Sequence, residues 1–251
     1  MVPLLRASLA TVFSSAALIS TMPALAASGD AVAIDLSARL QLALNADDRV
    51  QALSALMAPD QATTLIERFR RFSIRFPETR WAVRPGQALD DGRPTVQLAV
   101  SGTRQQDGLS YSFKANQRLA FSTAAGLITA QEVLSDQSVL TSSKKPLPIS
   151  LLIPDTVLTG SRYDVDVVVD QPLGKAMLAG GLTPVTAQQV LVQESPDVQL
   201  EPLGGGGLFK SVQAPFQPGI QTWAALLVHP DGVITVSKRV QVVDDKSKLN
   251  R

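Results

Sequence analysis

The chain has 251 residues, 45% of them hydrophobic, with 23 basic and 22 acidic side chains, one histidine and no cysteine. The lack of cysteine excludes disulfides, thiolate metal sites and cysteine nucleophiles, and a single histidine argues against a typical zinc or copper site. A charge this close to zero gives no long-range attraction to nucleic acid or to an anionic membrane. We therefore expect no cofactor, no metal and no nucleic-acid partner.

Residues 1–26 have the pattern of a secretory signal peptide. One charge, Arg6, precedes a mostly apolar stretch of small residues from Ala7 to Met22, and an Ala-Leu-Ala cleavage site ends at Ala26. The stretch is shorter than the roughly 20 apolar residues of a membrane anchor. Cleavage would remove Arg6 and leave 22 basic and 22 acidic residues. We expect an exported protein, periplasmic or secreted, with no stable membrane anchor after leader removal.

Three helices are predicted next. Apolar residues recur at helical spacing in the segments 34–44, 50–57 and 65–76. Asp47 or Asp48 would cap the second helix, and Pro59 marks the boundary before the third. The apolar stripe of the third helix is rich in phenylalanine, and Pro77 ends the helix because it lacks a backbone N–H.

Beyond Pro77 the period of the apolar residues changes to two, which is typical of strands. The strands expected here lie at about 81–83, 96–100, 111–121 and 127–140. Turns are predicted at Pro85-Gly86, Asp90-Asp91-Gly92, Asp107-Gly108 and Ala125-Gly126. Three helices followed by an antiparallel meander give an α+β pattern.

The last third of the chain reads as all-β. A linker over 142–146 precedes short strands at 149–153, 163–169, 176–179, 189–193, 198–200, 209–213, 220–228 and 233–243. Gly204–Gly207 is interpreted as a flexible hairpin loop, because the lysine and helix of a phosphate loop do not follow it. Many short strands separated by turns favour an antiparallel β-sandwich. We divide the chain into a leader (1–26), an α+β domain (27–143) and a β-sandwich domain with a short polar tail (144–251).

The α+β domain resembles the cone fold shared by nuclear transport factor two, ketosteroid isomerase, scytalone dehydratase and polyketide-cyclase-like proteins. The resemblance covers about 34–143 and rests on element order: three helices, the third ending at Phe76-Pro77, then long antiparallel strands. It implies a curved sheet wrapped against the helices, an apolar pocket at the open end and a homodimer through the sheet. The β-sandwich domain is similar to a generic immunoglobulin-like module.

The candidate catalytic residue is Glu132, in the last strand of the α+β domain. It lies at period two with Ile128 and Leu134, so it would face an apolar interior, where a carboxylate becomes a better general base. The competing interpretation is a glutamate paired with an arginine or exposed on the sheet. Gln117 and Gln131 are candidate polar groups of the same pocket. The only histidine, His229, lies in a Pro-Asp-Gly turn and is interpreted as a turn residue.

Arginines cluster between the third helix and the first strand. The candidates for binding a partner are Arg68, Arg71, Arg75, Arg80 and Arg84, and Arg70 lies among them. Arginine makes forked contacts with carboxylates and phosphates, so one interpretation is a face that docks an anion or a partner. The other is the ordinary charged outer face of an amphipathic helix.

These patterns favour a non-catalytic binding or assembly module of the extracytoplasmic space, holding a small apolar ligand or a protein partner. The first alternative is an enzyme of the isomerase, cyclase or dehydratase type with Glu132 as its base. The second alternative is a structural component of the envelope. A deep cavity with a convergent carboxylate would favour chemistry, and a filled cone would favour interaction.

Overall fold

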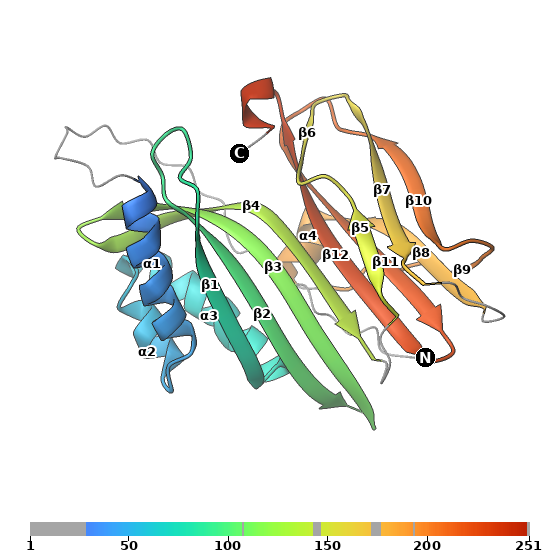
Figure 1. Cartoon of the computed structure of the whole chain (residues 1–251), viewed down its shortest axis with the longest axis horizontal. Coiled ribbons are helices and arrows are strands. Elements are labelled where there is room, and N and C mark those ends of the chain that lie inside the picture. The colour runs from blue at the N-terminus through green and yellow to red at the C-terminus, as the bar shows by residue number, and fades with distance from the viewer. Residues whose placement is uncertain (1–28, 107, 143–146, 172–176, 193, 250–251) are drawn as a thin grey trace. The chain divides into compact units, whose positions relative to one another are not determined.

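The computed structural model describes residues 29–106, 108–142, 147–171, 177–192 and 194–249 (Figure 1). The expected leader, Asp107 of one predicted turn and most of the predicted linker lie outside the described residues. The fold is α+β, as the sequence predicts: helices come first and a large antiparallel sheet follows. The helices are α1 (Gly29–Leu44), α2 (Arg49–Ser54) and α3 (Pro59–Arg75), and the first four strands are β1 (Glu78–Gly86), β2 (Thr95–Gln106), β3 (Leu109–Ala124) and β4 (Leu127–Thr141).

The described chain forms two compact units, and the division between them runs through β2, β3 and β4. The helical unit comprises residues 29–102 and 116–134, and the β unit comprises 103–115 and the chain from 135 onward. The β unit adds β5 (Ile149–Leu152), β6 (Thr156–Leu158), β7 (Arg162–Val169), β8 (Leu178–Val185), α4 (Ala187–Val192), β9 (Glu201–Leu203), β10 (Gly207–Gln213), β11 (Gly219–His229), β12 (Gly232–Val243) and a 3₁₀ turn at Lys246–Lys248.

The predicted cap of the second helix and the predicted boundaries of the third are confirmed, whereas α2 ends at Ser54 and not at 57. Asp48 caps α2, because its Oδ1 accepts the backbone N–H of Gln51 at 2.9 Å. α3 begins at Pro59 and ends at Arg75. Proline is well tolerated at the first position of a helix, because a backbone N–H there would have no partner within the helix. The phenylalanine stripe of α3 faces the sheet: the rings of Phe69 and Phe72 lie 6.0 and 5.6 Å from that of Trp81 in β1.

Strand β1 lies at the end of the strand order, but backbone groups of its outer edge form hydrogen bonds with side chains of α1 and of the turn that follows it. Gln41 Nε2 donates to the Trp81 carbonyl at 3.0 Å, and Gln41 Oε1 accepts the Val83 N–H at 2.7 Å. Asn45, one turn further along, donates to the same carbonyl at 3.0 Å and accepts the Trp81 N–H at 3.3 Å. Two side-chain amides thus replace a neighbouring strand, which protects an edge that would otherwise be open to pairing.

Two sheets make up the β unit. One has the order β4-β12-β11-β8-β9, with β6 paired to β12, and the other has the order β10-β7-β5. Side chains of both sheets share the same cores: Tyr163 and Val165 of β7 pack with Trp223 and Val240 of β11 and β12. A second core joins β7 to β8, β11 and β12 in the same way. The two sheets therefore pack face to face.

Four predictions about local structure are wrong. The strand expected at 189–193 is helix α4, because Thr186 and Gln189 form a reciprocal cap: the Gln189 N–H donates to Thr186 Oγ1 at 3.2 Å, and Gln189 Oε1 accepts the Thr186 N–H at 2.9 Å. Residues 198–200 are not a strand, and β9 follows at 201–203. The Pro85-Gly86 turn is part of β1, where the missing side chain of Gly86 lets Thr95 of β2 approach closely.

The Gly204–Gly207 segment is not a hairpin loop. It joins β9, which pairs with β8, to β10, which pairs with β7 in the other sheet. The chain therefore crosses here from one layer to the other. Gly207 lies so near the Val167 carbonyl that a Cβ atom would collide with it, so this position excludes larger residues.

Candidate functional site

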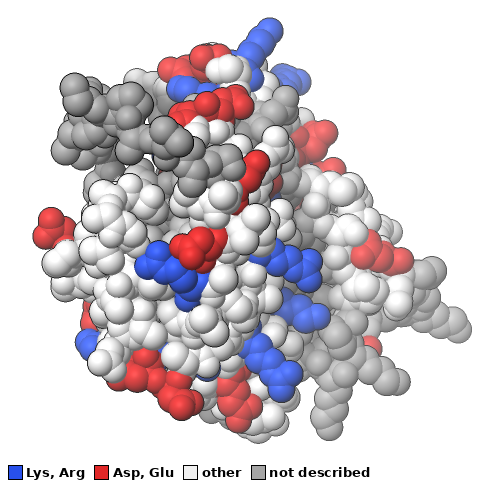
Figure 2. Space-filling model, turned by 60° about the vertical axis from the view of Figure 1, so that its left-hand side comes forward, with Lys and Arg blue, Asp and Glu red and all other residues white. Residues whose placement is uncertain are grey.

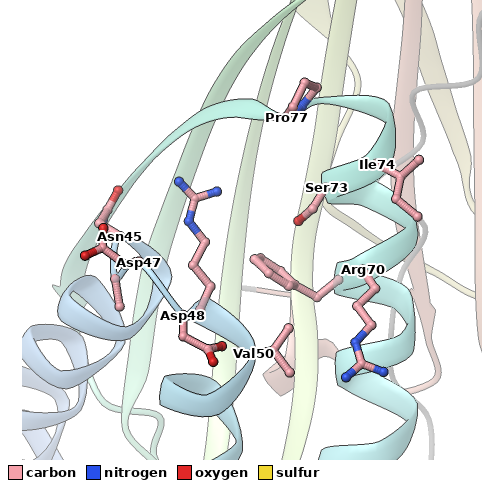
Figure 3. Close-up of a pocket in the computed structure, with 11 residues that line it drawn as sticks. Asn45, Asp47, Asp48, Val50, Arg70, Ser73, Ile74 and Pro77 are labelled. Atoms are coloured by element: carbon pink, nitrogen blue, oxygen red, sulfur yellow. The ribbon is translucent and has the colours of Figure 1, made fainter.

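The described part of the helical unit contains an open pocket of about 650 Å³ between the α1–α2 turn, α2 and α3 (Figure 3). Its apolar wall comes largely from α3, and its polar wall from the turn that leads into α2. The lining residues are Asn45, Ala46, Asp47, Asp48, Arg49, Val50, Phe69, Arg70, Ser73, Ile74 and Pro77. The volume falls within the range of small-molecule sites.

Part of the polar wall is already engaged in holding the fold together. Asn45 binds Trp81, as described above, and Asp48 caps α2. Arg49 Nη1 donates to Thr79 Oγ1 at 3.0 Å, and its Nη2 lies 3.4 Å from the Thr79 carbonyl. These contacts fix the turn against β1, so this wall of the pocket is preorganised.

The groups that face the pocket for a ligand lie on α3. Ser73 Oγ is buried and has no hydrogen-bond partner among the described residues, and Figure 3 shows its hydroxyl directed from α3 into the pocket. Arg70 lies three residues earlier on the same side of the helix and is exposed. One face of α3 therefore offers a ligand three groups: a cation, the ring of Phe69, and a hydroxyl that has no partner among the described residues.

None of the site residues predicted from the sequence lines this pocket. Gln117 and Gln131 are half-buried in β3 and β4, and Glu132 belongs to a surface ion pair. Arg70 belonged to the arginine cluster but was not among the selected candidates. Gln41 and Asn45 are one helical turn apart at the end of α1, and two amides at that spacing are a signal that this side of the helix binds polar groups.

Glu132 is held by an arginine, as the competing interpretation described. Arg93 Nη1 lies 2.8 Å from Glu132 Oε2, and Arg93 Nε lies 2.8 Å from Asp91 Oδ2. Burial alone would lower the pKa of Arg93, but hydrogen bonds to Glu132 and Asp91 outweigh it and raise that pKa. Leu134, two residues on and hence on the same side of β4, packs with Leu89 and Ala120. Glu132 therefore lies beside the loop between β1 and β2.

The clustered arginines divide between two elements. Arg68, Arg71 and Arg75 lie on α3, where Arg71 is 3.9 Å from Glu67. Arg80 and Arg84 lie on β1 and are exposed. Because alternate side chains of a strand point to opposite faces, both lie on the face away from Trp81 and α3. Burial and the neighbouring charge of Arg71 lower the pKa of Arg68.

Charged side chains of both signs are scattered over the face shown in Figure 2, and uncharged residues make up most of it. His229 lies in the β11–β12 hairpin, where its Nδ1 accepts the Asp231 N–H at 3.2 Å. Within the described ranges, no group of three or more histidine, aspartate or glutamate side chains has the arrangement of a metal site. No helix of the described chain is long and apolar enough to cross a membrane.

Residues 144–243 match the model of a family described as Domain of unknown function (DUF8623). The match covers less than half of the chain and includes most of the β unit. No curated protein matches the sequence.

Proposed function

We propose that the protein is an exported, non-catalytic binding module, and that the α2–α3 pocket takes a small amphipathic molecule with an anionic group. The observation that carries this proposal is the Ser73 hydroxyl, which is buried and directed into the pocket without a described partner. A buried hydroxyl that makes no hydrogen bond costs free energy. An acceptor atom of a ligand would remove that cost.

The chemistry of the remaining wall supports the same class of ligand. Arg70, three residues before Ser73 on α3, supplies an exposed cation, and the side chains of Val50, Phe69 and Ile74 supply apolar surface. Asp47 and Asp48 line the opposite wall, at the turn that leads into α2, so the anionic group of a ligand would lie on the α3 side of the pocket. A carboxylate or phosphate on a short apolar chain would pair its charge with Arg70 and lay the chain along Phe69.

The arrangement of elements supports the proposed fold families. Three helices precede four strands in the first part of the chain, and α3 packs its phenylalanines against β1, as in a cone fold. The two sheets of the β unit share their cores, as in an immunoglobulin-like sandwich. Export rests on the leader pattern of residues 1–26. The non-catalytic role draws support from the Glu132–Arg93 pair, which occupies the candidate base.

The pocket can be tested with octanoate as the probe and octanol as its uncharged match, by titration calorimetry and by NMR shifts of α2 and α3 amides. We expect octanoate to bind and octanol to bind more weakly. Arg70→Gln should weaken octanoate binding about 10-fold or more, since hydrogen bonds to charged groups contribute about 1.5–3 kcal/mol. It should leave octanol binding unchanged.

Arg84→Gln is the matched control, because Arg84 is an exposed arginine on β1 that does not line the pocket. It should leave octanoate binding as it is in the unmodified protein. If Arg84→Gln weakened binding as much as Arg70→Gln, or if octanoate shifted no amide of α2 or α3, the proposal would be wrong.

A further inference from the structure

Helix α1 is apolar on two opposite sides. Its inner side buries Leu36, Leu40 and Leu44 in the helical unit. On its outer side Ile34 is 60% exposed and Leu42 is 74% exposed. A helix at the surface ordinarily turns polar side chains to solvent, so the folding of this unit does not account for the outer side.

The exposed apolar residues form one continuous stripe, which we call the α1 stripe: Ala31, Ile34, Ala38 and Leu42, all exposed. With about 100° of rotation per residue, all four point within about 40° of the direction of Ala38. The stripe lies on α1 itself (blue in Figure 1), and β1 runs along one flank of it, where Gln41 binds the strand edge. Its spacing of three, four and four residues is that of a helix packed against another helix.

We propose that the α1 stripe packs against the same stripe of a second copy of this chain, with the two helices antiparallel about a two-fold axis at Ala38. The stripe is symmetric about that residue: Ile34 lies four residues before it and Leu42 four residues after it. In the antiparallel pair each Ile34 meets Leu42 of the other copy. The small Ala38 at the centre lets the helices approach closely, and such an interface is isologous.

The charges beside the stripe suit the same partner. Asp35 and Arg39 lie together on one flank, where Arg39 Nη1 is 3.4 Å from Asp35 Oδ2 and Arg39 Nη2 donates to the Gly126 carbonyl of its own chain at 2.9 Å. In an antiparallel pair that flank faces its own copy, and Asp35 of one chain lies about two residues, or roughly 3 Å, along the axis from Arg39 of the other. Two reciprocal ion pairs then form across the interface. A parallel pair would instead place like charges at the same level.

The extent of the stripe sets the expected strength. From Ala31 to Leu42 it extends about 17 Å along the helix. One helix pair of this length lies at the lower end of specific interface sizes, so the dimer dissociates on the order of micromolar concentrations or above. The α1 stripe shares no residue with the α2–α3 pocket, so self-association and ligand binding can be tested separately.

Sedimentation of the full chain without its leader provides the first test. We expect the mass to rise from monomer to dimer with concentration and Leu42→Lys to abolish the rise, because it places two ammonium groups in the interface. Thr63→Lys, at an exposed position of α3, is the control and should still dimerise. Both substitutions lie at exposed helix positions, so thermal unfolding of the dilute monomers should match the unmodified protein.

Cross-linking locates the interface, since the chain has no cysteine of its own. With helices about 8–10 Å apart and Cα atoms about 2.3 Å from each axis, the Cα atoms of the two copies of residue 38 come to about 3.4–5.4 Å, which overlaps the range of about 4.4–6.8 Å in disulfides. Ala38→Cys should therefore form a covalent dimer under mild oxidation. Gln97→Cys, at an exposed position of β2, is the control, because it would form a covalent dimer only if two copies met through the sheet. We expect this variant to stay monomeric.

A monomer at every accessible concentration would overturn the proposal. So would a dimer that Leu42→Lys does not weaken, or one that Gln97→Cys traps while Ala38→Cys does not. If the Leu42→Lys variant is monomeric and still binds octanoate, the α2–α3 pocket works without the dimer. Failure of the proposed dimer can therefore be distinguished from failure of the proposed function.

Discussion

Tyr163 is a single residue whose ionisation the fold opposes. It is buried in the β unit, where its hydroxyl donates to Gln221 Oε1 at 2.7 Å and accepts the Trp223 Nε1–H at 2.9 Å. Burial raises the pKa of Tyr163, and the hydrogen bond from Trp223 opposes that rise only in part. The folded state therefore retains the phenol proton at a pH where the unfolded chain has lost it.

We predict that Tyr163→Phe lowers the free energy of unfolding at pH 7 by about 1–3 kcal/mol, because the buried Trp223 N–H loses its acceptor. The tyrosine's contribution is fully present below the unfolded pKa of about 10 and is lost as pH rises through the higher folded pKa. The difference between the two proteins should therefore shrink with increasing alkalinity. Urea unfolding at pH 7 and in steps above about pH 9 measures it, and a constant difference would contradict the prediction.

At this scale sequence reasoning succeeds where the partner is local. The cap at Asp48 is visible because its acceptor and donor lie three residues apart. The pairing of Glu132 with Arg93 joins residues 39 positions apart in the sequence, and no local sequence pattern identifies which arginine pairs with Glu132. Ser73 was missed for the same reason: its importance comes from lacking a partner, and only the packed helix pair reveals that.

At the scale of elements, the outer edge of β1 depends on two amides of the α1 region. We predict that Asn45→Ala lowers the free energy of unfolding by about 1–3 kcal/mol, because the buried backbone N–H of Trp81 loses its acceptor. It should also raise the tendency to aggregate, since part of the strand edge becomes open to pairing. Thermal unfolding and light scattering at matched concentration are the measurements.

Gln51→Ala is the matched control for that variant, because Gln51 is exposed on α2 and only its backbone N–H takes part in the cap. It should change the free energy of unfolding by less than about 0.5 kcal/mol. Equal losses in the two variants would show that side-chain packing near α2, rather than the edge of β1, carries the effect.

Elements with a strong period were predictable, and elements fixed by caps or by neighbours were not. The alternation of β3 and β4 places those strands close to their structural bounds, whereas α3 begins six residues before its apolar stripe and β2 continues to Gln106. The segment of helix α4 is predicted as a strand, because its run Val190-Leu191-Val192 is apolar and rich in β-branched residues, and the Thr186–Gln189 capping box is the signal that this reading omits. The Gly204–Gly207 segment is predicted as a hairpin loop, because nothing in its sequence indicates that β9 and β10 belong to different sheets.

At the scale of the whole molecule, strand β4 continues from the helical unit into the β unit, which contains its residues from Ser135 onward. There it pairs with β12 over six positions, from Ile234 opposite Thr141 to Arg239 opposite Asp136. Ser138 Oγ and Ser237 Oγ are 2.7 Å apart. A fragment that starts at residue 144, where the sequence placed a domain boundary, therefore lacks a strand next to β12.

We predict that residues 134–251 form a more stable fragment than residues 144–251. Six ladder positions at about 0.5–1.5 kcal/mol for each hydrogen bond amount to roughly 3–9 kcal/mol, which is comparable with the entire stability of a typical domain. The shorter fragment should be largely unfolded or aggregated through the open edge of β12. Urea unfolding followed by the fluorescence of Trp223 compares the two fragments.

The longer fragment with Ser138→Pro separates strand pairing from chain length. Proline removes a ladder hydrogen bond and is poorly tolerated inside a sheet, so this fragment should behave like the shorter one although it has every residue from 134 onward. If it instead unfolded at the same urea concentration as the unsubstituted fragment, β4 would contribute little to the β unit. The stability of the β unit would then rest on the cores that its two sheets share, around Tyr163 and Val167.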